Sequence, residues 1–388
     1  MNNFDFYNPT RIFFGKNRLD VLDKQIPTTA KVLITFGGGS AKKSGLIERV
    51  KATLGQRKIF EFGGIEPNPH YETLMKAAEV VRNEKIDFIL AVGGGSVLDG
   101  TKFICLASHY KGDASKLLKF GFARITSKVV ENVVPFGAVL TLPATGSEMN
   151  DGAVISYDKG KYPVMSEMTF PKFSILDPEV TYTLPKIQVA NGIVDAFVHT
   201  VEQYITFPAD AKIQDHMAEG ILQTLIEIGQ TTINEPENYD ARANLVWSAT
   251  MALNGIIGVG VPQDWATHMI GHELTALFGI DHGQTLAIVY PALLDVRRDK
   301  KRAKILQYAE RVWNITSGSD DEKIDSAIQK TRGFFESLGI KTKLSEHGVT
   351  ADKIPLVINQ LKEHGLTALS ETRDLSLSES QKILEKAL

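Results

Sequence analysis

Short apolar runs alternate with amphipathic stretches through the first half of the chain. Apolar runs of strand length lie at residues 10–15, 31–36, 58–62 and 86–92. Two further strands are expected within 134–156, on either side of a hydroxyl-rich loop with Thr141, Thr145 and Ser147. Helical periodicity occupies about 44–54, 71–83 and 97–107 between these runs. The run IDFILAV at 86–92 is continuously apolar, as in a parallel strand buried on both faces. This alternation predicts an open, mostly parallel α/β sheet of Rossmann-like type.

The pattern changes after residue 184, where long stretches of helical periodicity replace the strand signals. Helices are predicted at 221–230, 241–253, 268–277, 301–313 and 321–338. No internal repeat, low-complexity segment or Gly/Ser-rich linker interrupts the chain. We therefore predict two domains, an α/β domain over residues 1–184 and an all-helical domain over residues 185–388.

Two glycine-rich turns follow predicted strands and lead into predicted helices. They are Gly37-Gly38-Gly39-Ser40 and Gly93-Gly94-Gly95-Ser96. Glycine lets the backbone approach a phosphate, and the free N–H groups at a helix N-terminus attract an anion. Neither turn matches a standard fingerprint, since Leu98 replaces the last glycine of G-x-G-x-x-G and Thr101-Lys102 reverses the P-loop order. Each turn taken alone is also compatible with a tight turn that binds nothing.

Four of the nine histidines fall in two short segments of the second half, beside an aspartate. Asp195 and His199 are four residues apart, as are His268 and His272, so each pair shares one face of a helix. His282 follows a Gly-Ile-Asp loop. A lone histidine in such a place is more often a hydrogen-bonded core or surface residue. The grouping of a carboxylate with several imidazoles favours a divalent metal site.

A zinc peptidase is the weaker interpretation of these histidines. Its H-E-x-x-H pattern needs a second histidine three residues after Glu273, and Ala276 stands there.

Composition narrows the classes of partner. Lys plus Arg number 43 against 46 Asp plus Glu, which gives a net charge of -3 and no basic excess for nucleic acid. No apolar run approaches the roughly 20 residues that span a bilayer, and the N-terminus lacks a signal-peptide pattern. The single cysteine, Cys105, lies in an apolar run and excludes an internal disulfide. We expect a cytoplasmic protein that acts on a small molecule, without nucleic-acid or membrane partners.

Five motifs now form a set: GGGS, GGGSVLDGTK, TLPATGSEMN, NGIVDAFVHTVEQY and HMIGHELTALFGIDHGQT. In this order they resemble the iron-containing alcohol dehydrogenase family, especially its NADPH-dependent butanol dehydrogenase and aldehyde reductase branch. The resemblance covers essentially the whole chain, and the last two motifs are the specific ones. It implies hydride transfer between NADP(H) and a short-chain aldehyde or primary alcohol at one divalent metal, Fe(II) or Zn(II), in a homodimer.

The resemblance also implies roles for individual residues. The metal ligands would be Asp195, His199, His268 and His282, and His272 would be catalytic, facing the nicotinamide and the substrate. The cofactor-binding positions would be Gly37, Gly38, Gly39, Ser40, Gly94, Gly95, Ser96, Asp99, Thr141, Thr145, Asn150, Gly152 and Lys161. Residues 1–184 would then be the dinucleotide-binding domain, and residues 185–388 the metal-binding and substrate domain.

The first glycine turn bears on the choice between NADP(H) and NAD(H). NAD-preferring relatives carry an acidic residue about where Gly38 stands, and such a residue would repel a 2′-phosphate. Here the turn offers backbone N–H groups and the Ser40 hydroxyl, with Lys42 and Lys43 close behind. The sequence therefore favours NADP(H) over NAD(H).

Three alternative functions remain open at this point. A glycerol dehydrogenase-like enzyme and a dehydroquinate synthase-like lyase share the expected architecture. The lyase needs a cluster of Arg and Lys for a phosphorylated acid, which the metal region does not supply. A metal-dependent hydrolase would need no glycine-rich cofactor turns.

Overall fold

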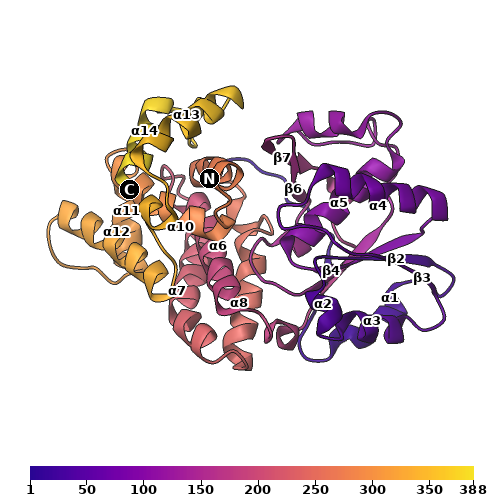
Figure 1. Ribbon diagram of the computed structural model, residues 1–388. Helices are drawn as coiled ribbons and strands as arrows, with labels where there is room; N and C mark the ends of the chain where they lie inside the picture. The colour runs from indigo at the N-terminus through magenta and orange to yellow at the C-terminus, as the bar shows by residue number, and fades with distance from the viewer. The chain divides into compact units, whose positions relative to one another are not determined.

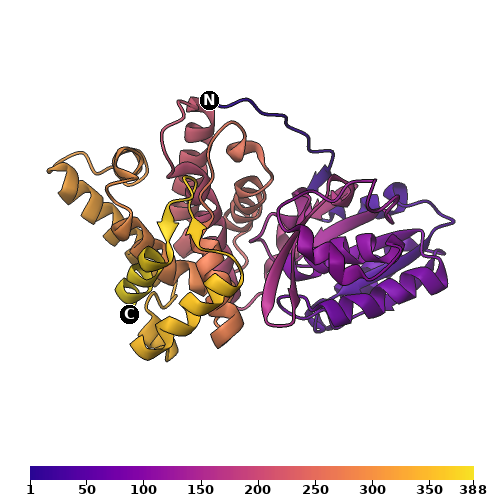
Figure 2. The same ribbon diagram turned by 90° about the horizontal axis from the view of Figure 1, so that it is seen from above.

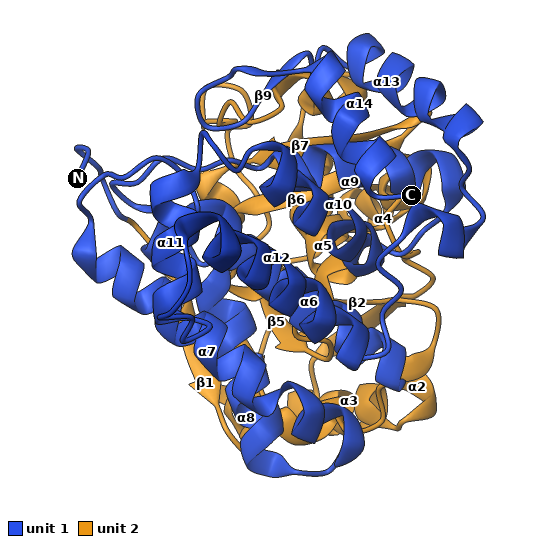
Figure 3. Ribbon diagram, turned by 90° about the vertical axis from the view of Figure 1, so that its left-hand side faces the viewer, with its two compact units in different colours: residues 1–6, 185–388 blue, residues 7–184 orange.

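The computed structural model describes all 388 residues, and the chain divides into two compact units. One unit comprises residues 7–184, and the other comprises residues 185–388 together with residues 1–6 (Figure 3). The first six residues, expected in the α/β domain, instead join the helical unit. Their backbone is bonded there, since Asn2 N donates to Gly260 O at 2.9 Å and the Met1 amine donates to Ala209 O.

The α/β unit is built on a six-stranded sheet in which every pairing is parallel, with the order β1-β8-β5-β4-β2-β3. Its strands are β1 (Arg11–Phe14), β2 (Lys31–Phe36), β3 (Lys58–Phe62), β4 (Phe88–Gly93), β5 (Phe136–Leu140) and β8 (Phe173–Leu176). The parallel sheet in the first half and the helices of the second half confirm the predicted fold class. Strand β8 was not predicted, because it lies in a stretch interrupted by prolines and its four residues are too few to show a pattern.

Helices cover both faces of this sheet (Figure 1). They are α1 (Leu22–Gln25), α2 (Ser40–Lys43), α3 (Leu46–Leu54), α4 (Tyr71–Glu84) and α5 (Gly95–His109), with 3-10 turns η1 (Arg18–Val21), η2 (Ala114–Phe120), η3 (Ser147–Met149), η4 (Glu167–Thr169) and η5 (Pro178–Thr181). Along β4, Leu90 and Val92 pack with α1 and α3, whereas Ile89 and Ala91 pack with α4 and α5. This division follows the period of two of a strand and explains the continuous apolar run.

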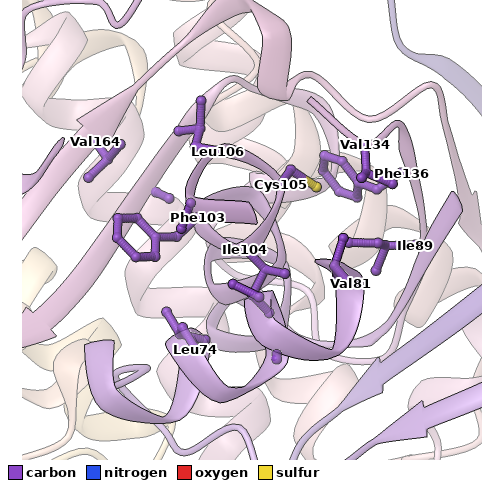
Figure 4. Close-up of a cluster of buried hydrophobic side chains, with 14 of the residues drawn as sticks. Leu74, Val81, Ile89, Phe103, Ile104, Cys105, Leu106, Val134, Phe136 and Val164 are labelled. Atoms are coloured by element: carbon purple, nitrogen blue, oxygen red, sulfur yellow. The ribbon is translucent and has the colours of Figure 1, made fainter. Parts of the chain in front are cut away.

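Cys105 is fully buried in the core between the sheet and α4 and α5 (Figure 4). Burial raises the pKa of its thiol, which keeps it protonated and unreactive. Cys105 is therefore a packing residue, as its apolar neighbours in the sequence predict.

The sheet has a topological switch point between β2 and β4. These strands are neighbours, with Phe36 paired to Val92, but the chain runs from β2 outward to β3 and later from β4 in the other direction to β5. Helix α3, after β2, and helix α5, after β4, pack on opposite faces. In open α/β sheets the crevice beyond the carboxyl ends at such a point is where ligands bind. Both glycine-rich turns lie at this place.

A two-stranded antiparallel hairpin, β6 (Gly152–Tyr157) and β7 (Gly160–Met165), stands apart from the main sheet. Helix α5 packs against β6. The hairpin carries Gly152, whose carbonyl accepts from Lys102 of α5, and Lys161, which donates to Asn68.

The second unit is mainly helical. Its helices are α6 (Lys186–Tyr204), α7 (Lys212–Asn234), α8 (Tyr239–Ala252), α9 (Ala266–Phe278), α10 (His282–Val296), α11 (Arg302–Arg311), α12 (Asp320–Ser337), α13 (Ile354–Glu363) and α14 (Leu377–Lys386), with 3-10 turns η6 (Ile256–Gly258), η7 (Leu344–His347) and η8 (Ala351–Lys353). Helices α9, α10, α13 and α14 share one apolar core. None of the helices is both long enough and apolar enough to span a membrane.

Two details of this unit differ from the sequence-based expectation. A small antiparallel pair, β9 (Ala368–Leu369) and β10 (Leu375–Ser376), interrupts the helices (Figure 2, yellow), and strands of two residues leave no periodic signal. His282, which follows the Gly-Ile-Asp loop, is the first residue of α10, a helix that was not predicted from the sequence. Gly283 and Pro291, both poor residues for a helix interior, obscured this helix in the sequence.

Candidate functional site

Helix α6 carries three polar side chains on one buried face. Asp195, His199 and Glu202 follow each other at intervals of four and three residues, so they lie along one side of the helix. Each is at most 4% exposed. Burial of so many ionisable groups costs free energy unless each finds a partner, so the face must meet complementary groups on neighbouring helices.

Three histidines converge on one carboxylate oxygen. The Oδ1 atom of Asp195 lies 3.5 Å from His199 Nε2, 3.7 Å from His268 Nε2 and 3.5 Å from His282 Nε2. The donor atoms of Asp195, His268 and His282 all lie within 4.8 Å of one another. His199 approaches Asp195 without joining that group of three, and its ring stacks on His268 with centroids 4.6 Å apart.

These separations suit an ion better than direct hydrogen bonds. Two ligand atoms each about 2.1 Å from a tetrahedral metal lie roughly 3.4 Å apart, close to the observed 3.5–3.7 Å. The buried His268 Nε2 atom has no hydrogen-bond partner. The donor set of imidazole nitrogen and carboxylate oxygen, without thiolate, could hold Fe(II) or Zn(II).

A glycine contact sets the position of His282. Helix α10 begins against the backbone of α6, and a Cβ built on Gly283 would lie 2.6 Å from Asn191 O and 2.9 Å from Asn191 Cα. Asn191 also donates from Nδ2 to Asp281 at the start of α10, at 3.2 Å. Because Asn191 lies one turn before Asp195, this close crossing places His282 over the carboxylate.

Glu202 binds the opposite side of the His268 ring. The Glu202 Oε2 atom contacts His268 Nδ1, and Oε1 accepts the backbone N–H of Thr267 at 2.6 Å. Burial alone would lower the pKa of His268, but the carboxylates of Glu202 and Asp195 raise it to about 9. Glu202 was not among the predicted site residues, although its spacing of three residues from His199 on the same helix could have indicated it.

His272, one turn beyond His268 on α9, lies beside the cluster rather than in it. Its ring centroid is 5.3 Å from that of His282 and 6.3 Å from that of His268. Its donor atoms do not belong to the group around Asp195. His272 is partly exposed, so it could contact a small molecule next to the cluster.

Trp265 forms a wall of the cluster. Its ring makes edge contacts with His268 and His199, with centroids 5.4 Å and 6.1 Å apart. Its φ of 64° is uncommon for a bulky residue and stores strain of about 1–3 kcal/mol, as often occurs at functional sites. Ile257, also an apolar residue of this region, is fully buried and serves the core.

The second glycine turn leads directly into α5. Gly94 is the N-cap of this 15-residue helix, and no acidic residue lies in its first turn. A Cβ on Gly95 would lie 2.5 Å from Thr145 Oγ1, so glycine is required for the approach of the 141–150 loop. The first amides of a helix lack intrahelical acceptors, so this turn suits an anionic group.

A buried polar network ties the hydroxyl-rich loop to α5. The Asp99 carboxylate accepts from Ser147 Oγ at 2.6 Å and from Val154 N at 2.9 Å. Lys102 donates to Asn150 Oδ1 at 2.8 Å and to Gly152 O at 2.7 Å. Burial lowers the pKa of Lys102 to about 8, against the opposing effect of Asp99. Asp99 and Asn150 thus make hydrogen bonds within the protein, in addition to any that they make to a cofactor.

Lys161 and Thr141 also lie near this turn. Lys161 donates to Asn68 Oδ1 at 2.7 Å, and Asn68 N in turn donates to Ser96 Oγ at 3.2 Å. Thr141 N donates to Gly93 O at 3.0 Å, which holds the end of β5 beside the turn. These contacts connect Lys161 and Thr141 to the turn itself, whereas Asn150 and Gly152 contact α5 further along, at Lys102.

The first glycine turn is open. A Cβ on Gly38 or Gly39 would meet nothing within 4 Å, and Gly37 alone is close to other atoms. Lys42 is not free beside this turn, because its ammonium donates to Glu61 at 2.9 Å. That pairing reduces the positive charge that the sequence analysis expected from Lys42.

Comparison with known proteins identifies the family. The model of the iron-containing alcohol dehydrogenase family matches residues 9–178, and the model of its C-terminal region matches residues 189–388. The chain belongs to the iron-containing alcohol dehydrogenase family. This membership confirms the resemblance of the motifs and favours an oxidoreductase over the lyase and hydrolase alternatives.

Several relatives in the family are similar over their full length. The chain is 59% identical to NADPH-dependent aldehyde reductase YqhD of Escherichia coli and 38% identical to NADH-dependent butanol dehydrogenase A of Clostridium acetobutylicum, with 100% of each chain covered in both cases. A crystal structure of E. coli YqhD matches with a TM-score of 0.97 at 58% identity, covering 100% of this chain and 99% of the other.

Proposed function

We propose that this protein is a metal-dependent NADPH aldehyde reductase that also acts as an alcohol dehydrogenase on short-chain primary alcohols. The single observation that carries the proposal is the convergence of three imidazole nitrogens on Asp195 Oδ1 in a member of this family. Similarity to an NADPH-dependent aldehyde reductase and to butanol dehydrogenases supports the reaction and the substrate class.

In this proposal Asp195, His199, His268 and His282 hold one divalent ion, Fe(II) or Zn(II). When bound, the ion supplies Lewis-acid polarisation of a carbonyl group, and NADPH supplies a hydride. His272 holds the proton that the product alcohol oxygen takes up, consistent with its place beside the cluster and its partial exposure. Trp265 excludes water from the cluster and offers an apolar surface to the aliphatic chain of the aldehyde.

For the cofactor, we propose that the α/β unit, residues 7–184, binds the dinucleotide, and that the helical unit, residues 185–388 with residues 1–6, holds the metal and the substrate. Gly94, Gly95 and Ser96 would hold the pyrophosphate at the N-terminus of α5. Asp99, Thr141, Thr145, Asn150, Gly152 and Lys161 would surround the rest of the dinucleotide. Gly37, Gly38, Gly39 and Ser40 would accept the adenosine ribose, and the open space at Gly38 and Gly39 leaves room for a 2′-phosphate.

An absorbance assay with butanal tests both the reaction and the choice of cofactor. We expect butanal-dependent loss of NADPH absorbance, with a kcat/KM at least about tenfold above that with NADH. A hydrogen bond from the first glycine turn, through a backbone N–H or the Ser40 hydroxyl, to the charged 2′-phosphate contributes about 1.5–3 kcal/mol. A tenfold ratio requires only about 1.4 kcal/mol. A clear preference for NADH would overturn the cofactor assignment, and no turnover with either cofactor would overturn the function.

We further propose that the protein is a cytoplasmic homodimer. The proposal rests on the family resemblance for the dimer and, for the location, on the single unpaired cysteine, which fits a reducing compartment. Light scattering of the purified protein should give twice the mass of the 42.7 kDa chain, and cell fractionation should recover the protein in the cytosol. A monomeric mass or recovery in another fraction would contradict the corresponding part.

A further inference from the structure

We propose that Glu202 is a positioning residue that fixes the tautomer and the ring orientation of His268. The inference deepens the proposed function, since it concerns the same metal site. It rests on the contact between Glu202 Oε2 and His268 Nδ1, and on the second bond of the same carboxylate to Thr267 N. The metal ligands that the motifs imply do not include Glu202.

The carboxylate is held from both sides. Glu202 is 1% exposed, and its Oε1 atom accepts one of the first backbone N–H groups of α9, which lacks an acceptor within the helix. The adjoining backbone is also fixed, because Asp264 N donates to Glu202 O at 2.9 Å. Asp264 itself pairs with the buried Lys301 at 2.9 Å. With Oε1 bound to an amide, the plane of the carboxylate is set and Oε2 faces the imidazole.

An ionised carboxylate only accepts hydrogen bonds, so it favours a proton on the imidazole nitrogen that it contacts. Metal binding requires the neutral ring, and in that form the protonated nitrogen is Nδ1. Nε2, 3.7 Å from Asp195 Oδ1, then keeps the lone pair that can bind a metal. Metal-bound histidines generally donate their second ring N–H in this way, and loss of the acceptor typically weakens metal affinity by 10–100-fold. Glu202 thus determines which nitrogen of His268 serves as ligand.

The variant Glu202→Gln tests this with almost no change in shape. The new carboxamide can place either its oxygen or its NH₂ group at the position of Oε1. The Thr267 N–H can only donate, so it favours the orientation with the oxygen there. The amide NH₂ then faces His268 Nδ1 and favours the tautomer with its proton on Nε2. We expect the full-length metal-free variant to bind Zn(II) about 10–100-fold more weakly than wild type, measured by competition with a chromophoric chelator. Saturating Zn(II) should restore much of kcat.

The chain supplies a matched control on a neighbouring helix of the same unit. Glu273 is a buried carboxylate of α9 that accepts from the imidazole of His364, with 2.7 Å between His364 Nδ1 and Glu273 Oε1. His364 is not among the residues around Asp195. Glu273→Gln should leave Zn(II) affinity unchanged. Equal affinity of Glu202→Gln and wild type, or equal losses in both variants, would overturn the proposal.

A measurement on the wild-type protein covers the case in which Glu202→Gln fails to fold. Nitrogen-15 NMR of the histidine-labelled, Zn(II)-loaded protein reports which nitrogen of each ring carries a proton. We expect His268 to retain the proton on Nδ1 and to bind through Nε2. Binding through Nδ1 would overturn the role of Glu202 but leave the metal site intact. If wild type bound no Zn(II) at these residues, the proposed function itself would fall.

Discussion

His268→Ala should lose the metal and most of the reductase activity together. His268 Nε2 is buried, lies 3.7 Å from Asp195 Oδ1 and has no hydrogen-bond partner, so alanine removes one of the four proposed ligands. Lewis-acid stabilisation is worth several kcal/mol, so we expect kcat/KM for butanal to fall by about 10³-fold or more. Metal analysis of the purified variant should show less than one ion per chain.

The variant His272→Ala distinguishes loss of the metal from loss of the proton donor. His272 lies one turn further along α9 and outside the group around Asp195, so its removal should leave the metal content unchanged. Turnover should still fall by about 10²–10⁴-fold, the usual contribution of a general acid. If His272→Ala also emptied the site, His272 would be a ligand and the division of roles would be wrong. The metal analysis of wild type would at the same time distinguish Fe(II) from Zn(II).

Gly283→Ala should destabilise the helical unit and loosen the metal site in one step. The new methyl carbon would lie 2.6 Å from Asn191 O, far inside the contact distance of about 3.5 Å, and the opposing atoms are helix backbone that cannot rotate away. Overpacking of this kind costs about 1–3 kcal/mol. Since His282 precedes Gly283, displacement of α10 also moves a proposed ligand away from Asp195.

Thermal unfolding and a metal titration would check both effects of Gly283→Ala. We expect a lower melting temperature of the metal-free protein and at least about tenfold weaker metal binding, in line with the free energy of one displaced contact. Gly220→Ala on α7 is the control, since a Cβ there meets nothing within 4 Å and alanine favours a helix. Wild-type stability and metal affinity in Gly283→Ala would show that α10 does not depend on this crossing.

Local patterns in the sequence were sufficient for much of the fold. The runs at 31–36 and 58–62 coincide with β2 and β3, and the continuous run at 86–92 overlaps β4, which is buried on both faces as predicted. Strands β2 and β4 can be recognised because nearly every side chain of a buried strand must be apolar, whichever way it points. The edge strand β3 is only partly buried and can be recognised by its β-branched and aromatic residues. Strand β8 and the β9–β10 pair were not predicted, because strands of four and two residues are too short to show a periodic pattern.

For the candidate site, too, the sequence predicts the local relations between residues but not the contacts between helices. The spacing of Asp195 and His199 predicts their common face, because the helical repeat alone decides it. The spacing does not predict that His282 opens a helix, or that Glu202 reaches His268 across 66 residues. Helix α6 is buried on nearly every side, so no polar face in the sequence indicates which neighbour each side chain meets.

The sequence by itself determined the class of the two units, the glycine turns and the one-turn spacing of the metal-binding residue types, since all of these are properties of neighbouring residues. Only the tertiary structure decided that three imidazole nitrogens converge on one oxygen of Asp195, that Glu202 contacts His268, and that Gly283 permits α10 to cross α6 so closely. The physical reason is that such contacts depend on how packed helices cross, and crossings are set by the shapes of distant side chains rather than by any local period.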